Sequence, residues 1–461
     1  MRVLLLNPPS ERVVIRDYFC SKTTKSNYLF HPVDLLVLSG TLAERHDTSV
    51  LDCVAERLDA ARARARIDAL APEVIVSLVG SVSWNEDRAF LAGQAAAGRR
   101  VLAIGDVLHE ASEQRLAEEP WLEAVLHVFA NRDVVHYLDG DLDVVEDMTV
   151  RADGGEPRRL LRVERKKRKG AFRVPRPRHE LFPERGYHFS FARRADFATV
   201  LTDYGCPYPC TFCVIGTLGF QTRDVADVLE EIDFLRARGR REIFFMDQTF
   251  GIGRERALAL CDAFAERGDL SWTAYTRPDY ADDELLAAMR RAGCHTVIMG
   301  VESADDGVLA GYRKGYATDR VRAGFANAKA HGLRTVGTFI IGLPEETEDS
   351  LRATLELAVE LDMDFMSVNM AVPRFGTPFR AQALELGLAD EKNLVMDQGG
   401  ADAFLPTRTL DRATMLAFKK RMIRRFYLRP SYLWRRLTSL KSPWELGAQF
   451  REGLALLRRN V

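Results

Sequence analysis

The chain has 461 residues, 47% of them hydrophobic, and a formal net charge of −1. This length exceeds what one hydrophobic core usually organises, so we expect two or three domains. The sequence shows neither an apolar run of roughly 18 to 20 residues nor a signal-peptide pattern, so we expect a cytoplasmic protein without a membrane span.

The first part of the chain is predicted to be an α/β domain over residues 1–140. Short apolar runs alternate there with helical patterns, and the expected strands are 3–9, 49–53, 74–80, 101–106 and 123–129. Parallel strands need helical crossover connections, so this alternation predicts a parallel sheet. Residues 141–181 lose the alternation and include the basic run RVERKKRK, so we predict a linker whose charges are solvated.

A second alternating series covers residues 182–384. Its expected strands are 198–204, 242–247, 271–276, 296–302, 335–342 and 365–372. Six such units predict a partial (β/α)6 barrel, whose functional residues gather at the carboxyl ends of the strands. Residues 385–461 are predicted to be mostly helical and basic.

Charge is unevenly distributed along the chain. Residues 411–461 carry 13 Lys+Arg and 3 Asp+Glu, so residues 1–410 hold 52 basic and 63 acidic side chains. This excess of acids favours a cationic small-molecule substrate over nucleic acid.

Three of the seven cysteines stand together directly after the first strand of the second series. They are Cys206, Cys210 and Cys213, in the loop CPYPCTFC. Such a loop can bind three irons of a [4Fe–4S] cube and leave the fourth iron without a protein ligand. A zinc knuckle is the alternative, but it needs a fourth ligand, and neither Cys261 nor His188 fits the spacing.

The cysteine spacing, with the aromatic Phe212 before the last cysteine, resembles the signature of the radical S-adenosylmethionine (SAM) superfamily. Further segments resemble later motifs of that superfamily in the correct order: FFMDQTF, MGVES, YRKGY, FIIGLPEET and PRFGTPF. The resemblance implies a [4Fe–4S] cluster on the three cysteines, an electron donor such as flavodoxin, and reductive cleavage of SAM to a 5′-deoxyadenosyl radical that takes hydrogen from a substrate.

The same resemblance implies a set of residues that contact SAM. Phe212 is expected beside the adenine, and the other expected contacts are Glu302, Ser303, Arg313, Lys314 and Gly342. SAM presents an ammonium, a carboxylate and ribose hydroxyls, which call for acidic, basic and polar partners. Each residue also has a local alternative, in which Glu302 pairs with Arg313 or Lys314 and the GLP segment is an ordinary turn.

The N-terminal domain resembles the flavodoxin-like module of radical SAM enzymes that bind cobalamin. The loops in which that group carries its cobalamin motifs read IGDVLHEAS and HVFANRD here, and both are degraded. His109 is the one remaining candidate for contact with cobalt, and a lone histidine is more often a hydrogen-bonded residue than a ligand. The degraded motifs therefore disfavour cobalamin, although they do not exclude it.

Together these features predict cobalamin-independent dehydration of a sugar diol in natural-product metabolism. The architecture resembles the radical SAM diol dehydratase of apramycin biosynthesis, which implies a cationic aminoglycoside substrate and a partner NAD(P)H-dependent reductase. Asp247, Gln248 and Asp203, at strand ends, are the candidate catalytic residues, with loop capping as their alternative role. The rival hypotheses are a cobalamin-dependent C-methyltransferase and an iron–sulfur protein with a structural or sensor role.

Overall fold

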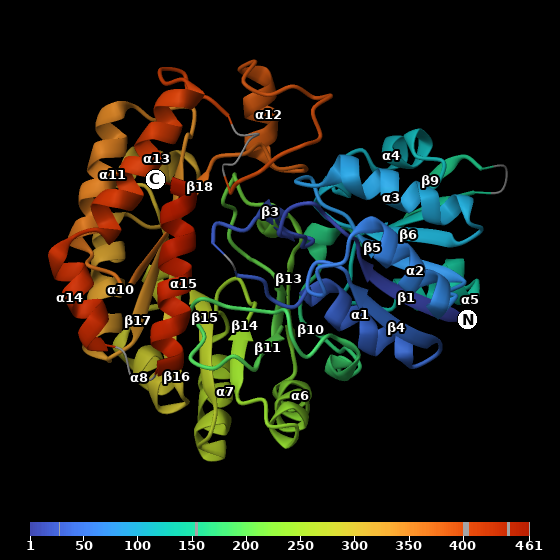
Figure 1. Cartoon of the computed structure of the whole chain (residues 1–461), viewed down its shortest axis with the longest axis horizontal. Helices are drawn as coiled ribbons and strands as arrows, with labels where there is room; N and C mark the ends of the chain where they lie inside the picture. The colour runs from blue at the N-terminus through green and yellow to red at the C-terminus, as the bar shows by residue number, and fades with distance from the viewer. Residues whose placement is uncertain (27, 153–154, 400–404, 440–442, 461) are drawn as a thin grey trace.

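The computed structural model contains two α/β domains, which lie side by side in Figure 1 with the C-terminal helices against the second domain. It describes residues 1–26, 28–152, 155–399, 405–439 and 443–460. The predicted α/β class, with a flavodoxin-like domain, a partial barrel and a helical C-terminal region, is confirmed.

The N-terminal domain is built on a sheet whose first five strands are parallel, in the order β4-β1-β5-β6-β7. They are β1 (Arg2–Asn7), β4 (Asp47–Asp52), β5 (Val74–Leu78), β6 (Arg100–Ile104) and β7 (Ala124–Leu126). The strands follow the predicted apolar runs because they are buried between helices on both faces. The helices are α1 (Val33–Ala43), α2 (Ala60–Leu70), α3 (Trp84–Ala96), α4 (Ser112–Glu118) and α5 (Asp133–Asp139).

The segment predicted as a linker is partly ordered into sheets. β8 (Asp147–Arg151) pairs antiparallel with β7, and β9 (Pro157–Leu161) pairs with β8 at the sheet edge. Met148 and Val150 are buried, and Arg159 on the outer strand forms an ion pair with the buried Asp147 at 2.9 Å. Arg158 and Arg159, just before the basic run, therefore belong to an edge strand, where charge discourages further pairing. Within the run, the prediction of solvated charges is wrong for Arg168, which is buried and forms an ion pair of 2.6 Å with Glu146.

The second domain contains a six-stranded parallel sheet in chain order, which matches the predicted partial barrel. Its strands are β11 (Phe197–Val200), β14 (Glu242–Phe245), β15 (Ser271–Thr276), β16 (Cys294–Glu302), β17 (Arg334–Ile341) and β18 (Phe365–Met370). The accompanying helices are α6 (Val225–Ala237), α7 (Arg254–Arg267), α8 (Asp283–Arg291), α9 (Asp306–Gly311), α10 (Thr318–Ala330) and α11 (Glu348–Glu360). Beside this sheet, β10 (Ala171–Phe172), β13 (Phe220–Arg223) and β12 (Asp203–Gly205) form a small separate one.

The chain ends in helices, as predicted. They are α12 (Pro378–Glu385), α13 (Arg412–Tyr427), α14 (Pro430–Ser439) and α15 (Pro443–Asn460). α13 packs against β18 and α11. Within the described part of the chain, none of the helices has the length and apolar character needed to cross a membrane.

A long connection between β1 and α1, residues 8–32, joins the two domains. It contains the short strands β2 (Val14–Ile15) and β3 (Lys22–Thr23), and in Figure 1 β3 lies between the two domains. Lys25 donates to Ser367 and Asn369 of β18, and Thr23 donates to Asp397. This connection therefore covers the carboxyl end of the barrel.

Candidate active site

A cavity of about 280 Å³ lies at the carboxyl end of the barrel, beneath the β1–α1 connection. The barrel supplies the ends of β14 to β18 to its wall, the cysteine loop supplies Phe212 and Cys213, and the connection supplies residues between Asp17 and Phe30. Functional residues of parallel βα folds gather at this end of the strands. The cavity is therefore the candidate active site.

The cysteine loop follows β12 and begins the cavity wall. Cys206 donates its backbone N–H to Gly219, and Cys213 donates to the carbonyl of Cys210, so the loop is folded back on itself. Burial, followed by the other two cysteines among its neighbours, raises the pKa of Cys206 to about 12, and burial and Cys210 raise that of Cys213 to about 11. The three thiols thus belong to one eight-residue loop, whose Cys213 lines the cavity.

No group of three His, Cys, Asp or Glu side chains is close enough to hold a single metal ion in the ranges that the structure describes. A [4Fe–4S] cube requires a wider arrangement, because each thiolate binds a different iron of the cube. Three thiols on one loop beside a cavity therefore fit such a cluster as a donor set. Cys261 and Cys294 are buried in the barrel core, away from the cavity wall.

Phe212, Glu302 and Lys314 form the part of the site that was predicted to contact SAM. Glu302 ends β16 with a φ of 63° and accepts a hydrogen bond of 2.7 Å from Lys314. The Lys314 ammonium lies 5.6 Å from the Phe212 ring. Burial alone would lower the pKa of Lys314, but Glu302 and the nearby Tyr316 raise it well above its usual range. The pair predicted as a local alternative is thus present, and Glu302 of this pair lines the cavity.

The remaining predicted SAM contacts are placed differently. Arg313 is exposed, and Ser303 is buried and accepts the backbone N–H of Asp305, so neither lines the cavity. Gly342 has a φ of 93° and donates its N–H to Glu346. Sequence reasoning did not select Glu346, although it lies within the quoted FIIGLPEET motif.

Glu346 is a buried carboxyl beside the cavity wall. It accepts the backbone N–H groups of Gly342 and Leu343, and its Oε1 has no hydrogen-bond partner among the described residues. Burial raises its pKa to about 8, against the lowering effect of the two N–H groups. The carboxyl therefore organises the loop after β17, and its second oxygen is available for another donor.

The three candidate catalytic residues separate in the structure. Gln248 lines the cavity, whereas Asp247 and Asp203 do not. Asp247 accepts both the N–H and the hydroxyl of Thr202 and the N–H of Asp203, so it caps the end of the neighbouring strand. Burial raises the pKa of both aspartates, and for Asp203 the nearby Asp247 adds to the effect. Asp247 therefore caps a loop, which was the alternative role predicted for it.

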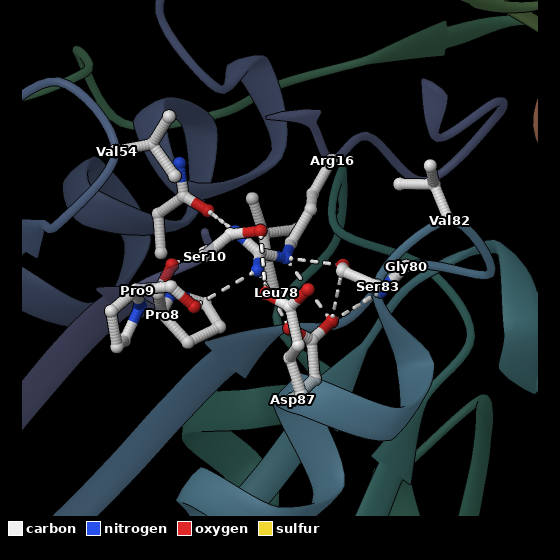
Figure 2. Close-up of polar contacts among 12 residues, drawn as sticks. Pro8, Pro9, Ser10, Arg16, Val54, Leu78, Gly80, Val82, Ser83 and Asp87 are labelled. Carbon is white, nitrogen blue, oxygen red and sulfur yellow. Dashed lines mark hydrogen bonds and ion pairs between the residues drawn. The ribbon is translucent and has the colours of Figure 1, made fainter. Parts of the chain in front are cut away.

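The carboxyl edge of the N-terminal sheet is filled by the protein's own side chains. Arg16 lies where β1 and β5 end, and Figure 2 shows its guanidinium between the turn at Pro8 and Pro9 and the start of α3. It forms an ion pair of 2.6 Å with Asp87, and both side chains are fully buried. In parallel sheets with this strand order, ligands usually bind in the crevice at the carboxyl ends of β1 and β5, where the strand order reverses.

The next residues of the same segment close the rest of this edge. The Tyr18 hydroxyl donates to the carbonyl of His127, and Ser21 donates to Asp106. His109 is buried against the Tyr18 ring and forms a hydrogen bond with the Tyr18 carbonyl, so it points into this packing. In the conformation described here, the edge of the N-terminal sheet does not fit a corrin ring, because Arg16, Tyr18 and Ser21 occupy it.

The comparisons with known proteins identify the class of the barrel and the architecture of the whole chain. Residues 200–358 match the model of the radical SAM superfamily, so the barrel is a radical SAM domain. The chain is 29% identical to the uncharacterized methyltransferase PH0819 of Pyrococcus horikoshii over 94% of each protein. It is 26% identical to the bacteriochlorophyllide d C-12(1)-methyltransferase of Chlorobaculum tepidum over 41% of this chain and 45% of the relative.

Two solved structures share the fold of nearly the whole chain. The methyltransferase TsrM from Kitasatospora setae, solved with cobalamin and a [4Fe–4S] cluster, superposes with a TM-score of 0.66 at 19% identity, over 84% of this chain and 75% of TsrM. The cobalamin-dependent SAM radical enzyme OxsB superposes with a TM-score of 0.69 at 16% identity, over 99% of this chain and 71% of OxsB. This protein therefore has the fold of radical SAM enzymes with an N-terminal cobalamin-binding-like domain.

These findings correct the predicted reaction. The expectation of a cobalamin-independent diol dehydratase, a lyase of aminoglycoside biosynthesis, is wrong, because the relatives and the structural neighbours are methyltransferases or cobalamin-dependent radical enzymes. The judgement that cobalamin is disfavoured is also unsupported, since neighbours of the same fold bind it. The radical SAM assignment, with its cluster and SAM, stands.

Proposed function

We propose that this protein is a radical SAM methyltransferase that uses cobalamin as its methyl carrier, the alternative set out in the sequence analysis. The observation that carries the proposal is the match to a methyltransferase over 94% of both chains. The cobalamin part rests on the shared fold of TsrM and OxsB. We also propose a small-molecule substrate and an external electron donor.

The residues of the cavity support SAM-dependent chemistry. When bound, the cluster supplies an electron for reductive cleavage of SAM. Cys206, Cys210 and Cys213 would hold it at the cavity wall, with Phe212 beside the bound SAM. Glu302 offers a carboxylate to the SAM ammonium or ribose, and Lys314 offers an ammonium to the SAM carboxylate. On binding SAM, the ion pair between Glu302 and Lys314 would be replaced by these two contacts with the ligand.

Cobalamin binding requires a rearrangement of the protein. Since Arg16 and Tyr18 fill the carboxyl edge of the N-terminal sheet, a corrin can reach that edge only after residues 13–24 move. The chain's own contribution is to line the cavity and keep bulk water from it through the β1–α1 connection.

The test is an anaerobic assay of reconstituted protein with SAM, a reductant, hydroxocobalamin and candidate small molecules. A methyltransferase forms S-adenosylhomocysteine and a product heavier by one methyl group, both measured by mass spectrometry. Cys210→Ala protein is the control for cluster-dependent turnover. Product formation that is equal with and without cobalamin would refute the carrier, and SAM cleavage to 5′-deoxyadenosine without any methylated product would refute the methyltransferase.

A further inference from the structure

Two lysines line the part of the cavity where the β1–α1 connection meets β18. Lys22 and Lys25, from the β1–α1 connection, line it together with Ser367 and Asn369 of β18. The Lys25 ammonium donates to Ser367 Oγ at 2.9 Å and to Asn369 Oδ1 at 2.6 Å. Both partners are neutral, so these contacts orient the ammonium but leave its charge unbalanced.

Neither lysine has a carboxylate within 4.0 Å in the described ranges of the chain. The other charges on the cavity wall are already engaged: Glu302 pairs with Lys314, and Arg374 lies 3.8 Å from Asp106. The acid nearest in sequence, Asp17, also lines the cavity and accepts the backbone N–H groups of Phe19 and Cys20. Burial alone would lower the pKa of Lys22, but Cys20, Tyr28 and Asp17 raise it above its usual value, so the uncompensated charge is that of Lys25. An ammonium in such surroundings is costly unless an anion accompanies it.

The electrostatics of Lys25 agree with a missing anion. Burial first, and then the positive charges of Lys419 and Lys22, lower its pKa well below the usual range. Lys419 is itself buried behind the wall, and burial lowers its pKa to about 8. A negatively charged ligand would reverse the effect of the neighbouring cations. The phenol of Tyr275 also lines this part of the cavity and can donate to such a ligand.

We propose that Lys22 and Lys25, oriented by Ser367 and Asn369, form a subsite for an anionic group of the methyl acceptor, a carboxylate or a phosphate. This proposal rests on the proposed function, because it assigns part of the same cavity to the substrate. It replaces the cationic substrate that the acidic composition of residues 1–410 suggested. Net charge describes a whole surface, whereas a substrate meets the few groups of the cavity wall.

The subsite is separate from the residues expected to bind SAM. Phe212 packs near Tyr312, Leu343 and Phe379, at the cysteine-loop side of the cavity. Lys22 lies over the ring of Phe30, which packs next to Phe189 and Phe244. Phe212 and Lys22 therefore contact different aromatic side chains of the cavity wall, and the proposed subsite uses none of the residues expected to bind SAM.

Direct binding of simple anions tests the subsite without requiring turnover. Inorganic phosphate, acetate and, as the opposite charge, methylammonium are titrated calorimetrically into reconstituted protein that already contains SAM. We expect wild-type protein to bind at least one anion and not methylammonium. Lys22→Met and Lys25→Met should each weaken the anion tenfold or more, because each removes a charge-assisted hydrogen bond. Tighter binding of phosphate or of acetate identifies the anionic group.

Matched variants separate this role from a general loss of structure. Lys392 is exposed, so Lys392→Met should bind anions like the wild type. Lys25→Arg should recover part of the affinity, and the affinity for SAM should stay within twofold in both methionine variants. Undiminished anion binding in both of them, no anion binding to wild type, or a parallel loss of SAM affinity would overturn the subsite. None of these results depends on methyl transfer, so the proposed function stands or falls by its own assay.

Discussion

The Arg16–Asp87 pair offers a quantitative test of how the N-terminal sheet edge is closed. Arg16→Met removes the guanidinium but keeps most of the apolar stem. It leaves Asp87 fully buried with only Gly80 N–H and the Ser83 hydroxyl as donors. Breaking a buried pair from one side costs about 3 to 5 kcal/mol, since the remaining charge loses its partner but not its burial.

The assay is urea unfolding at neutral pH followed by tryptophan fluorescence. Trp84 is buried at the start of α3, one turn before Asp87, and reports on this edge. We expect the free energy of unfolding to fall by about 3 to 5 kcal/mol in Arg16→Met and to recover largely in Arg16→Met/Asp87→Leu, because no buried charge is then left unpaired.

Arg88 provides the matched control at the next position of the same helix. Its ion pair with Glu119 is half exposed on the arginine side, so Arg88→Met should cost about 1 kcal/mol or less. A loss below about 1 kcal/mol in Arg16→Met, or no recovery in the double variant, would refute the view that this pair holds the connection onto the sheet.

Three further predictions concern the barrel. Cys210→Ala should lose the cluster in iron and sulfide analysis while Cys261→Ala keeps it, and a full cluster in Cys210→Ala would contradict the assignment. Glu302→Gln should weaken SAM about tenfold or more at unchanged iron content, since a charged hydrogen bond is worth roughly 1.5 to 3 kcal/mol; unchanged affinity would leave the residue only its pair with Lys314. Because burial raises the pKa of Glu346 to about 8, the wild type should lose stability as pH rises from about 4.5 to 8, by up to roughly 1.4 kcal/mol per unit. Glu346→Gln should remove this slope in thermal melts, and an equal slope in both proteins would contradict it.

Features with a local pattern could be predicted from the sequence. Each buried strand of the barrel appears as an apolar run, and the cysteine loop carries its spacing within eight residues. The position of Asp247 at a strand end was also predictable, but the direction of its side chain was not, because that depends on the backbone of Thr202 across the strand pair. The pairing of β8 and β9 was hidden because basic residues at a sheet edge resemble a solvated linker.

Features that depend on contacts between distant segments could not be predicted. Lys22 and Lys25 lie in a connection with no helical or strand periodicity, and only the packing of that connection onto β18 brings them to the cavity. The degraded motifs of the N-terminal domain suggested a loss of cobalamin and hence a different reaction. The similarity to methyltransferases is instead spread over most of the chain. A prediction of the reaction that depended on a few altered loop residues was therefore wrong.

The segment from Arg16 to Cys20 lies between the edge of the N-terminal sheet and the barrel cavity. Arg16 and Tyr18 contact the edge of the N-terminal sheet, while Asp17, Phe19 and Cys20 line the barrel cavity. Neighbouring residues of one backbone cannot move independently, so a ligand that shifts Asp17 or Phe19 also changes the packing of Arg16 and Tyr18. A displacement of this segment by a ligand in the cavity would therefore also act on the edge of the N-terminal sheet. Such coupling is reciprocal. If a substrate in the cavity changes the affinity of the sheet edge for a second ligand by some factor, that ligand changes the affinity of the cavity for the substrate by the same factor.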